Sequence, residues 1–236
     1  MISQVLHEPR NSLWSGLSGR DTLAWRPAPG AHTLGGKPLP LNRTWNSFFK
    51  RLVDIAGAAI GLVLSFPLLC FFACLVYRES PGPVFFAQYR VGRGGRAFKM
   101  FKLRTMKLGA EQEDHRYPST TRDDPRLLRV GKLMRRFSVD EVPQFWNVLR
   151  GEMSLVGPRP ERPIHLANLQ QQIPQYSERC AAKPGMTGWA QIHGFRGATS
   201  LTARVRCDRF YLDNWSLALD IKIMIRTLFL QDSAFQ

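Results

Sequence analysis

Two adjacent carboxylates, Asp140 and Glu141, are the side chains of this sequence best suited to do chemistry. Basic residues stand on both sides of them: Arg135 and Arg136 precede the pair, and Arg159 follows it between two prolines. Neighbouring carboxylates repel each other unless positive charge lies beside them. A divalent cation or a cluster of arginines can supply that charge, and both suit a phosphate substrate. The acid pair and its arginines are therefore the candidate reactive centre.

A structural explanation of the same residues is also open. Ser138, followed three residues later by Glu141, matches a capping box, and an aspartate in the first turn of a helix interacts favourably with the helix dipole. Pro143 is tolerated in such a turn, and Gly151 can end the helix. The two explanations are compatible, because the free N–H groups at a helix N-terminus can also face an anion.

Composition limits the kind of protein this is. The chain has 236 residues, of which 44% are hydrophobic and 22% charged, so most of it should fold. Its net charge of +15 implies a polyanionic partner: nucleic acid, an anionic membrane surface or a phosphorylated substrate. The cysteines form neither a disulfide framework nor a zinc pattern, which favours a reducing compartment.

An uncharged run from Ile55 to Tyr77 follows a tail, residues 1–42, that has no signal-peptide pattern and is expected to be flexible. The 23 residues of the run exceed the roughly 20 that a membrane-spanning helix needs. Pro67 predicts a kink or break in the middle, where the Ser65 hydroxyl can help to satisfy freed backbone groups. Basic residues flank both ends, and such flanks prefer the cytoplasm. A re-entrant helix-break-helix fits better than a kinked spanning helix or a buried core helix.

The elements that must position the acid pair lie on both sides of it. The runs Val84–Val91 and Ala97–Leu103, joined by a glycine-rich turn, predict a β-hairpin that carries basic and aromatic residues. Such residues occur in nucleic-acid binders, but the apolar anchor beside them makes lipid headgroups the nearer polyanion. Asp124 followed by proline fits a helix start and predicts a helix over Arg126–Arg136 that brings two arginines to the acid pair.

Beyond the acid pair, a helix is expected from His165 to about Gln172, and a turn after Lys183 should lead into a short strand. Lys183 in this turn could contact phosphate. The segment from Asp208 to Leu230 has a helical pattern, and its apolar end, Ile221–Leu230, fits an interfacial helix or one packed on the anchor. The expected fold class is mainly α with short β elements (α+β).

These residues together resemble the bacterial sugar transferases, the monotopic polyprenyl-phosphate sugar-1-phosphate transferases that initiate exopolysaccharide, capsule and O-antigen synthesis. The resemblance extends from about Lys50 to Leu230 and departs from the family pattern at Phe66, which separates the serine from the helix-breaking proline. It rests on several motifs in the same order, none of which would suffice alone. The motifs are Lys50–Asp54, Ser80–Phe86, Phe98–Met106, Asp140–Pro160, Lys183–Gln191 and Asn214–Ser216.

The resemblance implies a reaction: transfer of a hexose-1-phosphate from a UDP-sugar, such as UDP-glucose or UDP-galactose, to undecaprenyl phosphate, with release of UMP. It implies that Asp140 is the nucleophile and forms an aspartyl-phosphosugar intermediate. Glu141, with Asp140, would hold Mg²⁺. Arg135 and Arg159 match arginines of the family that bind phosphate. The basic residues Arg136 and Lys183 are further candidates for contacting the substrate phosphates.

The same resemblance implies a location. Residues 43–79 would form the re-entrant anchor, with its break at Ser65 and Pro67, and residues 80–236 a cytosolic, membrane-associated catalytic domain. The chain would lie at the bacterial inner membrane with this domain on the cytoplasmic face, and membrane lipid would be a partner. Two alternatives stay open: a membrane-tethered nucleic-acid-binding protein and a non-catalytic assembly protein. The sequence leaves the oligomeric state unassigned.

Overall fold

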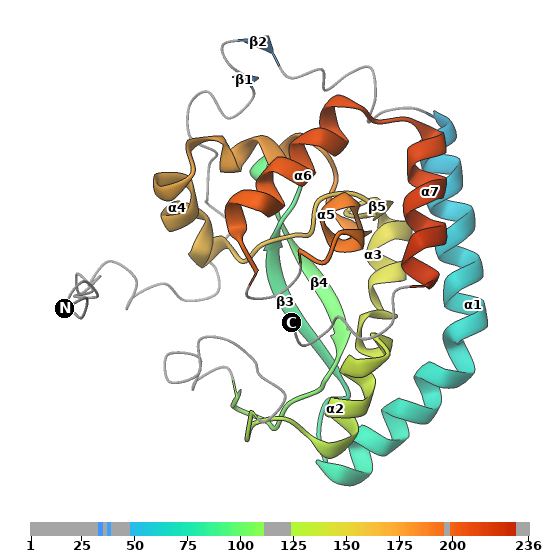
Figure 1. Ribbon diagram of the computed structural model, residues 1–236. Helices are drawn as coiled ribbons and strands as arrows, with labels where there is room; N and C mark the ends of the chain where they lie inside the picture. Colours follow the sequence, from blue (N-terminus) through green and yellow to red (C-terminus); the bar gives the residue numbers. More distant parts are fainter. Residues whose placement is uncertain (1–32, 35–36, 39–47, 111–123, 196–198, 230–236) are drawn as a thin grey trace, which may run out of the picture.

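A single long helix, α1 (Phe48–Glu79), forms one side of the computed structural model (Figure 1). The structure describes residues 33–34, 37–38, 48–110, 124–195 and 199–229, which leaves most of the tail outside it. Figure 1 shows that α1 bends about midway and then runs toward α2. Pro67 lies inside the helix, and the Ser65 hydroxyl donates to the carbonyl of Gly61 at 2.5 Å, a contact that often bends helices. The helix therefore bends, and the complete break that the sequence suggested is absent from α1.

The remaining helices wrap around the strands (Figure 1). Most of them are short, and two carry the acid pair and the residues just after it. In chain order they are α2 (Arg129–Arg136), the 3-10 turn η4 (Val139–Glu141), α3 (Gln144–Arg150), α4 (Pro163–Gln172), the 3-10 segment η5 (Pro174–Ala181), α5 (Trp189–Ile192), α6 (Leu201–Asp213) and α7 (Leu217–Leu228).

The predicted hairpin is confirmed. Strands β3 (Phe85–Val91) and β4 (Ala97–Leu103) pair antiparallel, from Phe85 opposite Leu103 to Val91 opposite Ala97. The turn η2 (Arg93–Gly95) joins them, and Gly94 adopts a φ of 64° that favours glycine. Two further pairs exist: β5 (Ser154–Val156) runs parallel to β6 (Gly185–Thr187), and β1 (Thr33–Leu34) runs antiparallel to β2 (Lys37–Pro38). The fold is thus mainly helical with a few short strands, as expected.

Both halves of α1 take part in the hydrophobic core. Ala58, in the first half, belongs to a cluster that includes residues of α3, β5, α6 and α7. Leu69, Phe72 and Val76, in the second half, pack in a cluster with residues of β4, α2 and η4. Glycines allow the close approach in the first half, because a β-carbon on Gly61 would lie 2.6 Å from the Phe145 ring. The helix is therefore attached to the same body along its whole length.

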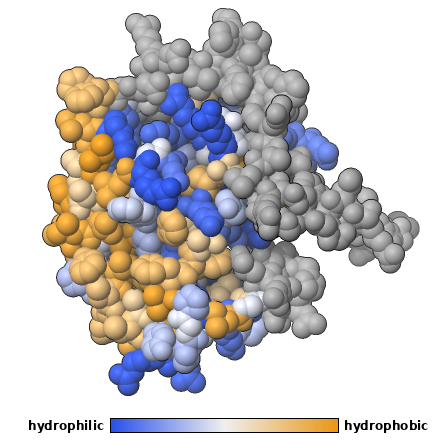
Figure 2. Space-filling model, turned by 180° about the vertical axis from the view of Figure 1, so that it is seen from behind, coloured by the Kyte–Doolittle hydropathy of each residue, from blue (hydrophilic) through white to orange (hydrophobic). Residues whose placement is uncertain are grey.

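The outer face of α1 is apolar and uncovered. Among the described residues, α1 is the one helix long and apolar enough to cross a membrane. Figure 2 shows apolar side chains gathered along the side of the molecule that α1 forms. Such a continuous patch is larger than monomeric soluble proteins usually expose and marks an interaction surface. Its members on α1 include Phe48, Phe49, Leu52, Ile60, Val63, Leu64, Phe66 and Phe71, and α7 adds Ile221, Ile225 and Leu228.

The start of the helix before the acid pair was predicted three residues too early. α2 begins at Arg129 because the Asp124 carboxylate binds Arg126 instead of capping a helix, with 2.7 Å between Asp124 Oδ2 and Arg126 Nη2. The next amides are used elsewhere: Leu128 N–H donates to the Thr105 carbonyl. The end of the predicted helix, Arg136, is confirmed.

The C-terminal segment is helical, as predicted, but it consists of two helices. α6 ends at Asp213, and the Ser216 hydroxyl caps α7 by accepting the Leu219 N–H at 3.1 Å. The segment after Lys183 contains the expected short strand, β6, and then continues as the short helix α5. The predicted helix near His165 is confirmed as α4, which begins at Pro163.

Candidate active site

A tight turn between α2 and α3 presents the acid pair. Ser138 has a φ of 55°, the one positive φ among the described non-glycine residues. Its hydroxyl makes no capping hydrogen bond, and its carbonyl accepts the Glu141 N–H at 3.1 Å, so the capping-box explanation is wrong. This strained residue lies between α2 and the 3-10 turn η4, which carries Asp140 and Glu141. Gly151, with a φ of 80°, ends α3 as predicted.

Glu141 is held by two cations. Its Oε1 atom lies 2.6 Å from Arg159 Nη2 and 2.7 Å from Lys102 Nζ, and its Oε2 atom accepts Arg159 Nη1 at 3.3 Å. Although burial opposes it, the charges of Arg159 and Lys102 hold the pKa of the Glu141 carboxyl well below its usual range. In return, the carboxylate of Glu141 raises the pKa of Arg159. Glu141 is therefore ionised and fixed in position.

Asp140 differs from its neighbour. Asp140 is only 5% exposed, yet its one ion pair joins Oδ2 to Lys102 Nζ at 3.7 Å, and no hydrogen bond from the described residues reaches its carboxylate. Burial raises the pKa of the Asp140 carboxyl, and the ammonium of Lys102 only partly opposes the rise. Asp140 is thus a buried carboxylate with an incomplete set of partners, which is the state expected of a nucleophile rather than of a structural acid.

Arginines complete the surroundings of the acid pair. Arg135 Nε donates to the Thr105 hydroxyl at 3.0 Å, which turns its guanidinium toward β4. Burial lowers the pKa of Arg135, and the negative charge of Asp140 opposes this. We refer to Asp140, Glu141, Lys102, Arg135 and Arg159 as the acid-pair cluster. The cluster combines four of the six predicted catalytic and phosphate-binding residues with a lysine from the hairpin.

The backbone that carries Arg159 is itself held in place. Arg179 Nη2 donates to the Arg159 carbonyl at 3.0 Å, and Arg179 Nε binds Asp208 Oδ2 at 2.6 Å. Arg90 Nη1 approaches the neighbouring Pro160 carbonyl at 3.4 Å. Arg179 of η5 and Arg90 of β3 thus fix the proline-flanked segment, and the Arg159 side chain is left to bind Glu141.

Two predicted phosphate contacts lie outside this cluster. Arg136 is exposed at the end of α2, with its guanidinium 5.6 Å from the centre of the Phe137 ring. Lys183 lines a hollow with Lys50, Arg51 and other residues of α1 and β5. Among the described residues, no hydrogen bond or ion pair joins Lys183 to the acid pair. The helix-break residues Ser65 and Pro67 lie within α1, as described above.

Lys102 is the functional candidate that sequence reasoning missed. Its position on β4 is 39 residues from Glu141, and nothing local distinguishes it from the exposed Lys99 on the same strand. The one feature of the sequence that could have indicated Lys102 was its position within the motif Phe98–Met106, which the chain shares with the family that it resembles. A second residue, Gln144, is 1% exposed, and its amide nitrogen has no hydrogen-bond partner in the described part of the chain.

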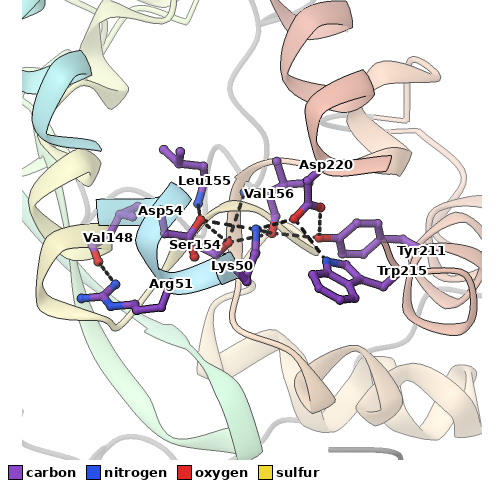
Figure 3. A network of polar contacts seen from close by, with 10 residues as sticks. All are labelled: Lys50, Arg51, Asp54, Val148, Ser154, Leu155, Val156, Tyr211, Trp215 and Asp220. Carbon is purple, nitrogen blue, oxygen red and sulfur yellow. Dashed lines mark hydrogen bonds and ion pairs between the residues drawn. The ribbon is translucent and has the colours of Figure 1, made fainter. Parts of the chain in front are cut away.

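A second polar cluster, the docking network, fixes the N-terminal end of α1 (Figure 3). Lys50 is 4% exposed, and its ammonium lies 3.3 Å from Asp54 Oδ1 and 2.8 Å from Asp220 Oδ2. Asp220 also accepts the Tyr211 hydroxyl at 2.7 Å and the Trp215 indole N–H at 3.1 Å. Burial, with the nearby Asp220, raises the pKa of Tyr211 well above its usual range.

The other acid of the docking network joins α1 to β5. Asp54 Oδ1 accepts the Ser154 hydroxyl at 2.9 Å and the Leu155 N–H at 3.0 Å (Figure 3). One lysine thus neutralises two carboxylates whose other lone pairs are filled by neutral donors. Full pairing of this kind suits attachment of one element to another rather than chemistry.

The acid pair fits a magnesium ion in part. Among the residues that the structure describes, no group of three histidine, cysteine, aspartate or glutamate side chains is arranged to hold a metal. Mg²⁺ usually takes one or two carboxylates and completes its coordination with water and substrate phosphates. The oxygens of Asp140 and Glu141 therefore suit Mg²⁺ when a phosphate substrate supplies further ligands.

Comparisons with known proteins identify the family of this chain. The family model described as bacterial sugar transferase matches residues 45–231. The chain is 43% identical over 197 residues to the UDP-glucose:undecaprenyl-phosphate glucose-1-phosphate transferase of Caulobacter vibrioides, which covers 82% of this chain and 72% of the relative. It is 45% identical over 188 residues to a protein of the same description from Escherichia coli.

A relative with another sugar in its name is about as similar. The UDP-N-acetylgalactosamine-undecaprenyl-phosphate N-acetylgalactosaminephosphotransferase of Aeromonas hydrophila is 42% identical over 184 residues. The matches cover 77% of this chain but 43% of the Aeromonas protein, and 78% of this chain but 40% of the Escherichia coli protein. The chain thus spans less than half the length of these two relatives.

Proposed function

Because the chain belongs to the bacterial sugar transferase family, we propose that it transfers a sugar phosphate from a UDP-sugar to undecaprenyl phosphate and releases UMP. The names of several relatives support this reaction, since they describe undecaprenyl-phosphate sugar phosphotransferases. We propose glucose-1-phosphate as the group transferred, because glucose appears in the names of the Caulobacter and Escherichia coli proteins. The Aeromonas name makes N-acetylgalactosamine the first competitor.

The observation that carries the proposal is the contrast within the acid pair. Asp140 is buried without a close partner, whereas Glu141 is bound by Lys102 and Arg159 at 2.6 to 2.7 Å. In the proposed first step, an Asp140 oxygen attacks the β-phosphorus of the UDP-sugar. The bond from that phosphorus to the bridging oxygen breaks, and UMP leaves with the bonding electrons. A phosphosugar remains on Asp140 as an acyl phosphate.

In the proposed second step, an oxygen of undecaprenyl phosphate attacks the same phosphorus. The bond to Asp140 breaks, the carboxylate is restored, and undecaprenyl diphosphate sugar forms. Lys102, Arg135 and Arg159 would offset the negative charge on the phosphoryl oxygens in both steps, because pre-positioned cations are most effective in a site that excludes water. Splitting the transfer lets the two substrates, one from water and one from the membrane, react in turn.

Asp140 and Glu141 would hold Mg²⁺ together with the diphosphate of the donor. When bound, the ion supplies positive charge that neutralises the substrate phosphates and lowers the pKa of the carboxylates it touches. A carboxylate whose pKa is raised by burial needs such help to be ionised. The protein's own part is to orient Glu141 through Arg159 and Lys102, so that Asp140 stays available for attack.

We further propose that α1 enters and leaves the membrane on the same face. At its N-terminal end, Arg51 donates to the carbonyls of Val148 and Leu149 at 2.7 Å. At its C-terminal end, Glu79 accepts the backbone N–H groups of Arg129 and Val130 at 2.6 and 2.9 Å. A spanning helix would separate these ends by the roughly 30 Å of hydrocarbon in a bilayer. Attachment of both ends to one polar body supports the re-entrant arrangement.

Cysteine labelling tests this topology. In a chain whose own cysteines are replaced, Asn46→Cys and Arg96→Cys should both be shielded from a membrane-impermeant reagent added to whole cells, and both should react after lysis. The basic flanks of α1 support a cytoplasmic face for both sites. Labelling of one site but not the other in whole cells would mean a spanning helix.

The reaction is tested by UMP release. Purified chain should release UMP from UDP-glucose when Mg²⁺ and undecaprenyl phosphate are present, and chelation of Mg²⁺ should stop it. UDP-galactose and UDP-N-acetylgalactosamine in parallel assays identify the preferred sugar. Release from UDP-N-acetylgalactosamine alone would replace glucose in the proposal, and release from none of these donors would contradict the proposed reaction.

A further inference from the structure

We propose that Arg51 and Lys183 form a second anion site, separate from the acid pair, that binds the phosphate of an anionic membrane lipid beside the N-terminal end of α1. The inference rests on the proposed attachment of α1 to the membrane, but it does not depend on the transfer reaction. Two residues far apart in sequence meet there, one on α1 and one just before β6.

The two cationic groups face a common point. A β-carbon on Gly151 would lie 3.5 Å from Arg51 Nη2 and 3.6 Å from Lys183 Nζ. Gly151 carries no side chain and, with a φ of 80°, ends α3. Both nitrogens therefore border the same space in front of Gly151, where different oxygens of one phosphate can reach a guanidinium and an ammonium.

Among the described residues, Asp54 is the one acid that lines this hollow, and it forms its ion pair with Lys50 and not with Arg51 or Lys183. Arg51 Nη1 and Nη2 bind only the carbonyls of Val148 and Leu149, and no carboxylate among the described residues pairs with Arg51. Lys183 has no hydrogen-bond or ion-pair partner in the described part of the chain. Lys50, which lines the same hollow, already neutralises Asp54 and is bound to Asp220.

Electrostatics around Lys183 favour the binding of an anion. Its side chain is half-buried, and burial, followed by the charge of Arg51, lowers the pKa of Lys183, although Asp54 opposes this. The charged form of such a lysine is disfavoured by its surroundings, and a bound anion would stabilise it. In the docking network, by contrast, the buried lysine is supplied with acids by the protein itself.

The position of the site favours a lipid. Phe48 and Phe49, in the first turn of α1, are 75% and 67% exposed, and Leu52, next to Arg51, is 52% exposed. An anion held by Arg51 therefore lies beside exposed apolar side chains of α1, which acyl chains can cover. Phosphate at the boundary between a basic group and an apolar surface is the chemistry of a phospholipid headgroup.

The test measures retention of a defined lipid by the full chain in an uncharged detergent. The probe is dioctanoyl phosphatidylglycerol, with dioctanoyl phosphatidylcholine as the reference, and retained lipid is counted by native mass spectrometry. Lys183→Gln should weaken retention of phosphatidylglycerol about fivefold, the effect of one basic residue near an anionic lipid surface. Lys183→Arg should restore it. Arg209→Gln, which removes a charge from the outer surface of α6, should change nothing.

Competition separates the possible sources of phosphate. UDP-glucose or a short polyprenyl phosphate should not displace the retained phosphatidylglycerol. Displacement by either would assign the two cations to a substrate and overturn a separate lipid site. Equal retention by the wild type and Lys183→Gln would overturn the site and leave membrane attachment intact, whereas a wild type that retains no lipid of either kind would overturn both.

Discussion

The two buried polar clusters of this molecule use the same residue types in opposite ways. In the docking network, one lysine, Lys50, is bound by two aspartates, and neutral donors fill their remaining positions. In the acid-pair cluster, Glu141 takes the close contacts of Lys102 and Arg159, and Asp140 is left with a cation at 3.7 Å. The first cluster is complete without a ligand, and the second is not.

The difference teaches how to tell attachment from chemistry. Burying a charge is unfavourable, so a protein that gains only stability from a buried acid surrounds it with partners. A buried acid that lacks partners is retained for what it does to a substrate. By this criterion the docking network holds α1 on the body of the protein, whereas Asp140 is the group on which we propose that the phosphosugar is carried.

The largest effect should follow removal of the Asp140 carboxylate. Asp140→Asn is expected to lower the rate of UMP release on the order of 10⁴-fold or more, because an amide cannot replace a carboxylate nucleophile. Asp213→Asn, which alters an exposed acid on α6, is the matched control and should retain full activity. An Asp140→Asn chain as active as the control would place Asp140 with the structural acids and erase the contrast between the clusters.

The docking network should respond in stability instead. Lys50→Met leaves Asp54 and Asp220 buried without their cation, and breaking such a pair destabilises a protein by about 3–5 kcal/mol. Chemical unfolding in detergent measures the change in the free energy of unfolding. Lys222→Met, at an exposed position on α7, should cost about 1 kcal/mol or less. If both variants are equally mild, the network is not what fixes the start of α1.

Two lysines of strand β4, Lys102 and Lys99, allow a role in the reaction to be told apart from a role at the surface. Lys102→Met should lower the rate of UMP release about 10²-fold to 10³-fold, the range found when one stabilising donor is removed from a reacting centre. Lys99→Met is the control, because Lys99 lies on the same strand and only approaches the Tyr89 ring at 5.7 Å. Equal rates for both would remove Lys102 from the acid-pair cluster.

The smallest expected effect is a dependence of stability and of the rate of UMP release on pH. Because burial raises the pKa of Asp140, its protonated form is favoured in the folded chain, and stability is lost as pH rises through that folded pKa. Asp140→Asn should therefore unfold at a higher temperature than the wild type at neutral pH, and the difference should shrink in acid. The rate of UMP release should fall as the solution is acidified, and the fall should begin at a pH above the usual pKa range of aspartate. An unchanged unfolding temperature at neutral pH would contradict the incomplete pairing of Asp140.

Local patterns made part of this fold predictable. The alternation in Val84–Val91 and Ala97–Leu103 and the glycines between them gave the hairpin to within one residue, because strand and turn signals act over short distances. The start of the helix predicted at Arg126 was wrong for the opposite reason, because a contact of a side chain decided it. Its proposed cap, Asp124, is taken by the Arg126 side chain, and propensity alone does not show this competition.

Contacts between distant residues decided the rest. The acids and arginines of the candidate site stand close together in sequence, which made Asp140, Glu141, Arg135 and Arg159 recognisable as a group. Lys102 joins them only through the packing of β4 against η4. The docking network was invisible in the sequence because Lys50 and Asp220 are held together by the folded arrangement of α1 and α7.

Trapping the proposed intermediate tests the central claim most directly. The chain should be incubated with Mg²⁺ and a UDP-sugar labelled at the β-phosphate, without undecaprenyl phosphate, then quenched and digested for mass spectrometry. We expect a phosphosugar on the peptide that contains Asp140, its loss after addition of undecaprenyl phosphate, and no adduct in Asp140→Asn. Continued UMP release in the complete reaction, with no phosphosugar on Asp140 under any of these conditions, would contradict a covalent role for this carboxylate.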